Sequence, residues 1–496
     1  MPLTSLPAPR GRCRLGVAQV DITPPPDAYH RNWGAALHDR AAGIHRPLTA
    51  SALAVAPLAA GTPAVVLVAL DLGWLRTREM ADLLAAVRRG VGAAAGDVVL
   101  TFSHTHAAIG LDLEREGEPG GEHIRPYLEA LPDLVADACR RAAAALVPAE
   151  VSFGRGRCDL AMNRDCRDEE RGIYVCGPNP QGVADDAVLV ARATALDDGR
   201  PLLALVNYAC HATTLAWENK LISPDYVGAL REVVAAETDS PCVFLQGAAG
   251  DLGPRYGFVG DPAVADANGR QLGFAALAAL ASLPPPGLEL RYQGPLVSGA
   301  TLGVWRHAPV DPAGLDRFRT RELVVDLPLR PLPSAAELAR LEDEWRSREE
   351  EARRRGDEEE VRTCRAQVER ARRAGRRREE LSPSGLAEYR VRLWQVGQGV
   401  FVLVGGEPYS LLQRELRARF PDTPLVVAEL CNHSYSYILP RDQYGKGLYQ
   451  DDCATLAPGS LEAIIEAVAA QLAAWGCADP AARRPDHRAA LRPQRS

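Results

Sequence analysis

The sequence predicts an α/β protein whose core is a mixed β-sheet with flanking helices, plus a charged helical-hairpin insertion. Short Val- and Leu-rich runs, typical of buried strands, occur at 64–70, 97–103 and 201–208. An amphipathic helix is expected at 76–89, between the first two. This alternation of strands and helices is typical of a layered α/β core. Further short strands bounded by Gly and Pro, as at 151–156, favour a mixed sheet over a purely parallel one.

The composition is that of an ordinary globular protein and excludes several functional classes. The chain has 496 residues with 57 basic and 64 acidic side chains, and its net charge of −7 argues against a nucleic-acid partner. No apolar run approaches the ~18–20 residues that would span a bilayer, so we expect no transmembrane segment. The N-terminus lacks the apolar stretch of a secretion signal, and 11 cysteines without paired spacing do not indicate a disulfide framework. We therefore expect a cytoplasmic protein, either a monomer or an oligomer.

One segment departs sharply from this composition. Residues 341–380 contain 13 arginines and 13 acidic residues, so that their charges balance. Charges of both signs at helical spacing favour solvent-exposed helices with salt bridges. We expect a helical-hairpin insertion at 334–381 that divides one large domain into 1–333 and 382–477, followed by a disordered tail at 478–496. The alternative, a partner-binding coiled coil, would need sustained apolar heptads, which this segment lacks.

Histidines follow two of the expected strands. His104 and His106 come directly after the strand at 97–103, and His211 follows the strand at 201–208. The carboxyl ends of strands are where the ligand sites of α/β proteins collect, and imidazole is a common zinc ligand. The three side chains therefore favour a shared metal site, while a lone His-x-His pair is as often two polar loop residues.

Such a metal site needs one or two oxygen ligands, for which the sequence offers several candidates. Glu407 follows an expected strand at 400–404 and a Gly-Gly turn, which would place a carboxylate at a third strand end. Alternatively, Glu407 faces the positive end of the helix expected at 409–419. Asp251 lies in a Gly-rich turn that forms either an anion-binding nest or an ordinary tight turn. Position alone does not choose among these alternatives.

Six short segments in a fixed order carry a more specific signal. They are Gly16–Pro25, Thr101–His106, Ala161–Arg164, Cys210–Thr213, the segment headed by Gly406 and Glu407, and Asn432–Tyr449. In order and spacing they resemble the motifs of the N-terminal catalytic domain of the neutral/alkaline (non-lysosomal) ceramidases, zinc-dependent amidases of lipid metabolism. The resemblance covers roughly residues 15–456 and is that of a divergent bacterial-type member.

For the metal, the resemblance implies one Zn²⁺ per chain held by His104, His211, Glu407 and Tyr437. Two imidazoles, a carboxylate and a phenolate suit zinc, and they also accept iron or manganese. The implied activity is hydrolysis of an amide (N-acyl) bond by a metal-activated water, with a small N-acyl or lipid-like compound as the substrate. The large domain would then be a ceramidase-like zinc hydrolase.

For catalysis, the resemblance implies that His106, Arg164 and Tyr449 surround the reacting group. His106 would act as a general acid or base, and Tyr449 would donate a hydrogen bond to the developing oxyanion. The guanidinium fork of Arg164 would hold a carboxylate or polar head group. Asp251 would orient a ligand histidine.

Departures from the family pattern affect the expected substrate. The ceramidases carry a serine in a GDVSPN segment where this chain has Gly253, and we find neither the secretion signal nor the C-terminal immunoglobulin-like domain of the secreted members. We therefore expect ceramide itself to be cleaved weakly or not at all. Two other functions remain open, namely a metal-dependent esterase or lyase on the same site, and a non-catalytic metal-binding homologue.

Overall fold

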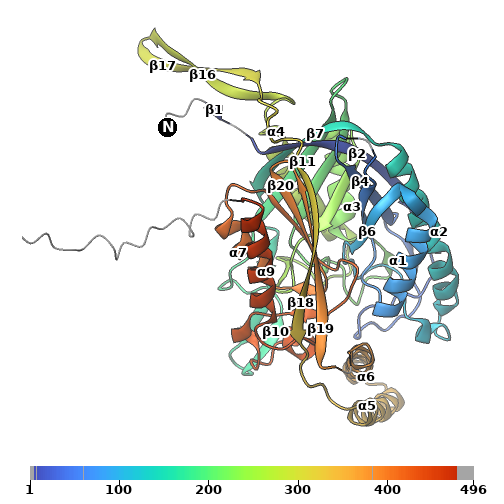
Figure 1. The fold of residues 1–496 in the computed structure, drawn as a ribbon. Coiled ribbons are helices and arrows are strands. Elements are labelled where there is room, and N and C mark those ends of the chain that lie inside the picture. Colours follow the sequence, from blue (N-terminus) through green and yellow to red (C-terminus); the bar gives the residue numbers. More distant parts are fainter. Residues whose placement is uncertain (1–4, 7, 60, 383, 478–496) are drawn as a thin grey trace, which may run out of the picture.

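The computed structural model describes residues 5–6, 8–59, 61–382 and 384–477, and its largest element is an eight-stranded sheet (Figure 1). The strands lie in the order β14-β12-β11-β7-β2-β4-β5-β6. They are β2 (Arg10–Asp21), β4 (Thr49–Ala56), β5 (Ala64–Leu70), β6 (Ala95–Phe102), β7 (Val147–Arg157), β11 (Ala187–Ala195), β12 (Pro201–Tyr208) and β14 (Cys242–Gln246). Only the pairs β12–β14 and β5–β6 are parallel in this sheet. The prediction of an α/β fold with a mixed sheet is therefore confirmed, whereas the tail expected at 478–496 lies outside the described residues.

A second sheet of four strands packs against the first, and helices cover the outer faces of both. The second sheet consists of β18 (Phe318–Pro328), β19 (Leu386–Val396), β20 (Gly399–Val404) and β22 (Leu425–Ala428), in that order. The first sheet is covered by α1 (Thr77–Val91), α2 (Ile124–Ala144), α3 (Tyr226–Thr238) and α4 (Pro262–Ala281), and the second by α7 (Leu411–Arg419) and α9 (Ser460–Ala474). Figure 1 shows the resulting four layers, helix–sheet–sheet–helix.

The two faces of β5 show why its sequence is uniformly apolar. Val65 and Leu67 belong to a buried cluster that includes Phe401 of the second sheet. Val66 and Val68 instead belong to the cluster beneath α1 and α2. Because successive side chains of a strand point to opposite faces, a strand in an inner layer needs apolar residues at every position. The continuous run at 64–70 follows from this double burial.

Short paired strands and a projecting ribbon complete the fold. The short pairs are β3 (Gly43–Ile44) with β13 (Leu221–Ile222), β8 (Ala161–Asn163) with β15 (Leu252–Pro254), β9 (Asp165–Asp168) with β10 (Ile173–Cys176), and β21 (Glu407–Pro408) with β23 (Tyr437–Ile438). The ribbon of β16 (Leu288–Ser298) and β17 (Ala300–Pro309), with β1 (Ser5–Leu6) along its edge, extends away from the body in Figure 1. Among the described residues, none of the helices combines the length and hydropathy that crossing a bilayer requires.

Two antiparallel helices lie where the sequence predicts a helical hairpin. They are α5 (Ala335–Arg355) and α6 (Glu358–Glu379), inserted between the paired strands β18 and β19. Ser334 and Glu337 form a reciprocal capping box at the start of α5, which satisfies backbone N–H groups that a helix leaves unpaired. Gly356 ends α5 with a φ of 70°, a left-handed conformation that favours glycine.

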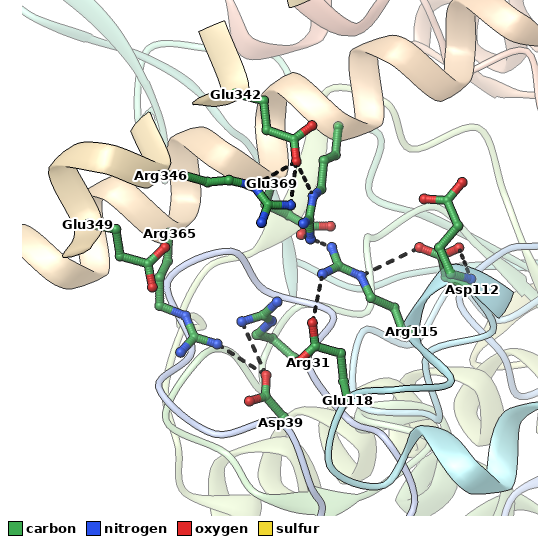
Figure 2. A network of polar contacts seen from close by, with 12 residues as sticks. Arg31, Asp39, Asp112, Arg115, Glu118, Glu342, Arg346, Glu349, Arg365 and Glu369 are labelled. Atoms are coloured by element: carbon green, nitrogen blue, oxygen red, sulfur yellow. Dashed lines mark hydrogen bonds and ion pairs between the residues drawn. The ribbon is translucent and has the colours of Figure 1, made fainter. Parts of the chain in front are cut away.

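The hairpin is less solvated than its balanced charges suggest. Figure 2 shows its charged side chains meeting those of the body. Glu369 of α6 pairs with Arg115, whose side chain is 3% exposed. Arg365 of α6 and Arg31 of the body both lie 3.1 Å from the Asp39 carboxylate. The expectation of a solvent-exposed, salt-bridged hairpin is therefore wrong for the face of α6 that meets the body, because charges on this face are paired with partners far away in the sequence.

Candidate metal centre and cavity

His104 leaves the end of β6 in an unusual backbone conformation. Its φ of 62° lies in the left-handed region, which costs a non-glycine residue about 1–3 kcal/mol. The Ser103 N–H donates to Leu70 O at 2.9 Å and the His104 N–H to Leu72 O at 3.1 Å, and these bonds hold the turn. The ring is buried, and its Nδ1 lies 2.7 Å from Gly73 O. Because a carbonyl only accepts, Nδ1 carries the proton and Nε2 presents a lone pair.

His211 is held in the same way after β12. Its backbone N–H donates to Leu252 O at 3.2 Å, and its Nδ1 lies 2.8 Å from Ala249 O, so that Nδ1–H donates there and Nε2 is left with a lone pair. The residue is completely buried. Burial, and next the charge of Arg164, lower the pKa of His211 to about 3. The imidazole is therefore neutral near pH 7, the form that binds metals.

Glu407 and Tyr437 are brought together by a ladder of two residues. They begin β21 and β23, which pair in parallel with Glu407 and Tyr437 as direct partners. The Glu407 N–H donates to Ser436 O at 2.9 Å. Gly406 precedes the ladder with a φ of 69°, a turn that a residue with a Cβ would strain. Glu407 thus lies at a strand end, the first of the two alternatives that the sequence leaves open.

Three ligand atoms converge on one point. His104 Nε2 lies 3.1 Å from His211 Nε2, and Glu407 Oε2 lies 3.2 Å from each of these nitrogens. The Tyr437 hydroxyl is 3.3 Å from His211 Nε2. Four ligand atoms placed tetrahedrally about 2.0–2.1 Å from a zinc ion would be about 3.3–3.4 Å apart. The spacing in the structure therefore fits a small divalent cation.

The chemistry of the donors supports the same fit. With Nδ1 of His104 and His211 donating to carbonyls, their Nε2 lone pairs face each other and the carboxylate of Glu407. No proton lies between these acceptors when the rings are neutral, so their close approach is unfavourable unless a cation is shared among them. An imidazole, imidazole and carboxylate set, with a phenol beside it, suits Zn²⁺ and does not distinguish it from iron or manganese.

His106 lies beside these ligands. Its ring centroid is 4.8 Å from that of His104 and 5.5 Å from that of Trp74. Its ring nitrogen lies within 4.8 Å of those of His104 and His211, a looser spacing than the 3.1–3.2 Å within the ligand group. Burial, and next His104 and His211, lower the pKa of His106 well below its usual value. Its buried Nε2 has no hydrogen-bond partner in the described part of the chain, so an unpaired ring nitrogen stands next to the ligand group.

A cavity of about 820 Å³ opens beside the candidate metal centre. His104, His106, Glu407 and Tyr437 line it from the strand ends. Tyr449, the first residue of α8 (Tyr449–Cys453), also lines it, with 42% of its surface exposed and its ring centroid 5.8 Å from that of Tyr437. Five of the eight sequence-predicted site residues thus share the wall of one cavity of a size usual for small-molecule sites.

Arg164 lies behind the ligands rather than in the cavity wall. It is buried, and its NH2 group donates to Gly250 O at 2.9 Å and to the Tyr437 hydroxyl at 3.1 Å. The same NH2 group lies 3.2 Å from His211 Nε2. Arg164 is absent from the residues that line the cavity. Its geometry favours positioning Tyr437 and His211 over the predicted contact with a substrate carboxylate.

Asp251 does not orient a ligand histidine, and that prediction is wrong. Its carboxylate accepts from the backbone N–H of Ser410 at 2.6 Å and from the Ser410 hydroxyl at 2.9 Å. An orienting carboxylate would accept from Nδ1 of a ligand histidine. In the structure, the Nδ1 atoms of His104 and His211 instead face the carbonyl oxygens of Gly73 and Ala249. Asp251 therefore fixes the start of α7, close in sequence to Glu407.

Sequence reasoning missed the opposite wall of the cavity, which α6 contributes. Arg373 and Arg377 line the cavity from this helix, and the Arg373 guanidinium lies over the Trp74 ring at 5.6 Å from its centroid. Trp74 in turn contacts His104 and His106. The arginines were visible as part of a charged helix, but no local signal shows which face of that helix meets the cavity.

Comparison with known proteins agrees with this geometry. Residues 13–255 match a family model described as neutral/alkaline non-lysosomal ceramidase, N-terminal. This part of the chain is similar to that family. The resemblance seen in the sequence is thereby confirmed for the half that contains His104, His106 and His211, while Glu407 and Tyr437 lie beyond the matched residues.

Two solved ceramidase structures share the fold. The neutral ceramidase from Pseudomonas aeruginosa is 18% identical with a TM-score of 0.62, over 93% of this chain and 74% of that chain. A structure described as a ceramidase complexed with C2 is 18% identical with a TM-score of 0.60, over 94% of this chain and 76% of that chain. At this level of identity the likeness establishes the architecture and leaves the chemistry to the residues of the site.

Proposed function

We propose that this protein is a zinc-dependent hydrolase that cleaves an amide (N-acyl) bond. The observation that carries the proposal is the convergence of His104 Nε2, His211 Nε2 and Glu407 Oε2, 3.1–3.2 Å apart, at the wall of a cavity. The family match and the ceramidase structures support the amide as the bond and an N-acyl or lipid-like compound as the substrate. One Zn²⁺ per chain held there would act as a Lewis acid on a carbonyl group and lower the pKa of a water molecule.

The residues around the ligands would transfer the proton, stabilise the oxyanion, position a ligand and exclude water. The unpartnered Nε2 of His106 accepts a proton from the attacking water and returns it to the leaving amine. Tyr449 lines the cavity, and its hydroxyl would donate to the carbonyl oxygen as negative charge develops on it. Arg164 holds the Tyr437 hydroxyl through a 3.1 Å hydrogen bond. Trp33 and Trp74 pack on the His106 ring and keep bulk water away from it.

The test is a substrate panel with controlled metal content. Protein stripped with a chelator and protein reloaded with one equivalent of Zn²⁺ are compared on N-acyl amides and on esters of the same acyl chain. We expect amide hydrolysis by the reloaded protein alone. Metal-independent hydrolysis, or cleavage of the esters without the amides, would contradict the proposal.

The free state of the eleven cysteines also supports the proposed cytoplasmic location, since reduced thiols are usual there.

A further inference from the structure

The wall that α6 adds to the cavity has an unusual charge. Eight arginines and six carboxylates line the cavity, whereas the whole chain carries a net charge of −7. The lining thus has two more arginines than carboxylates, although Arg31, Arg376, Arg390 and Arg392 also pair with carboxylates outside the lining. An arginine left without such a partner in a low-dielectric wall favours an anionic ligand.

Ion pairs within the protein neutralise this charge only in part. Glu369 is shared between Arg115 and Arg373, with 3.2 Å to Arg373 Nε, so that one carboxylate serves two cations. The side chain of Arg377 forms neither an ion pair nor a hydrogen bond with any described residue, although it acts electrostatically on Tyr449. Arg373 uses Nε for Glu369 and one NH2 hydrogen for Asn32 O at 2.7 Å. Its NH1 group has no protein partner among the described residues and remains available to a ligand.

These two arginines line the same cavity as the proposed metal ligands His104 and Glu407. They are one helical turn apart on α6 and therefore on the same face. Arg373 lies over Trp74, and the Trp74 ring centroid is 6.0 Å from that of His104. A single aromatic ring thus separates the guanidinium from a proposed metal ligand. Leu75, Ile109 and other apolar side chains of the same cavity belong to the core cluster beneath α1 and offer a surface for an acyl chain.

We infer that Arg373 and Arg377 bind an oxyanion of the substrate, so that the N-acyl compound carries a carboxylate or phosphate close to its amide bond. The inference rests on the proposed amide hydrolysis for the identity of the bond, but the anion site stands on the geometry of α6. Paired arginine forks match the shape and charge of such groups. Arg164, the arginine that the sequence suggested for this role, has its donors directed at Gly250 and Tyr437 instead.

The test compares ligands that share one acyl chain and differ only in the charge next to the amide. The ligands are N-dodecanoylglycine, its uncharged glycinamide analogue and N-dodecanoyl-phosphoethanolamine. For the zinc-loaded full chain we expect one of the two anions to be cleaved with a kcat/KM at least ~10-fold above that of the amide analogue. Arg377→Gln should reduce that ratio about tenfold, mainly through KM, and added salt should reduce it further. Arg378→Gln, an exposed neighbour on α6, should leave the ratio unchanged.

Binding measurements separate failure of this inference from failure of the proposed function. The same three ligands are titrated calorimetrically into zinc-loaded wild-type protein and the Arg377→Gln and Arg373→Gln variants. Tighter binding of an anion that both variants weaken, without any hydrolysis, would leave the oxyanion site standing and overturn the amidase. Equal binding or cleavage of the charged and uncharged ligands by the wild type would overturn the oxyanion site. Preference for the phosphate over the carboxylate, or the reverse, identifies which oxyanion the site takes.

Discussion

The two walls of the cavity are built on different physical principles. On one side, His104, His211 and Glu407 are buried and fixed by backbone hydrogen bonds at strand ends. On the other, Arg373 and Arg377 are long side chains on an inserted helix, held partly by ion pairs or left without a carboxylate. The first wall suits chemistry that needs fixed atoms, and the second suits recognition of a charged group that differs among substrates. In the proposed function, reaction type and substrate choice are therefore carried by separate parts of the chain.

The largest effect is expected from substitutions of the proposed metal ligands at the strand ends. His104→Ala and His211→Ala each remove one of three converging ligand atoms, so we predict loss of the bound metal and a fall in amide hydrolysis of roughly 10³-fold or more. Metal content is measured on the purified variants by inductively coupled plasma mass spectrometry, with circular dichroism to confirm folding. His307→Ala, on the exposed face of the β16–β17 ribbon, is the matched control and should keep both.

The second prediction concerns a substitution that breaks the contact between the hairpin and the body. Glu369→Ala leaves Arg115, with 3% of its side chain exposed, without its closest carboxylate. Removing one partner of a buried pair costs about 3–5 kcal/mol, and urea unfolding should show a loss of that order. Glu344→Ala breaks the exposed pair with Arg348 on α5, with side chains 52% and 50% exposed, and should cost about 0.5 kcal/mol or less. Equal losses in the two variants would mean that α6 is as solvated as α5.

The third prediction concerns Tyr449, which lines the same cavity. Tyr449→Phe removes a hydroxyl from the cavity without removing the ring, and an oxyanion donor acts mainly in the transition state. We predict a lower kcat with little change in KM. The fall in kcat should correspond to a loss of about 2.7–4 kcal/mol of transition-state stabilisation for a well-placed donor. Tyr256→Phe, at a tyrosine that is 62% exposed, is the control. A change confined to KM would assign Tyr449 to substrate binding.

The fourth prediction concerns how the free energy of unfolding depends on pH through Glu369 of α6. Burial raises the pKa of Glu369, but Arg373 and Arg115 outweigh it and lower that pKa to about 2. A carboxylate with a depressed folded pKa stabilises the fold above its unfolded value of about 4.3, and this contribution is lost as the pH falls toward 2. The free energy of unfolding should therefore fall across this window by about 3 kcal/mol from this group. Glu369→Gln, which does not titrate, should show a shallower fall.

The smallest expected effect lies at Gly253. A Cβ there would meet Arg164 Cδ at 3.6 Å and Thr213 Oγ1 at 3.9 Å, which are ordinary contacts, and Gly253 is outside the cavity wall. Gly253→Ser should fold with a stability change within about 0.5 kcal/mol and should not raise the rate of amide hydrolysis. A marked gain on ceramide, measured against the wild type, would show that the missing serine alone restricts the substrate.

The sequence predicted those features that depend on short stretches of chain. The apolar run at 64–70 is β5, and His104 and His211 follow their strands as expected. Glu407 could not be chosen from position, because its contact with Tyr437 depends on a parallel ladder between segments 30 residues apart. The resemblance to the ceramidases named Glu407 and Tyr437 as metal ligands. The ladder shows how the fold brings these two residues together.

Other features depend on contacts that no local pattern records. The charges of α6 are balanced at helical spacing, which is equally compatible with a solvated helix, and contacts with the body, such as those with Arg115 and Asp39, decide which face is buried. The role expected for Asp251 failed because the Ala249 carbonyl was free to bind His211 Nδ1. The β16–β17 ribbon gave no recognisable signal, since its strands are mostly exposed on both faces.

The central claim, a divalent metal held by His104, His211 and Glu407, is tested most directly by anomalous diffraction. Crystals of the full chain loaded with Zn²⁺ are measured on both sides of the zinc absorption edge. The account predicts one anomalous peak per chain among His104 Nε2, His211 Nε2 and Glu407 Oε2, at about 2.0–2.2 Å from each, with none in crystals of His211→Ala. A peak elsewhere, or none among these three atoms in zinc-loaded protein, would contradict it.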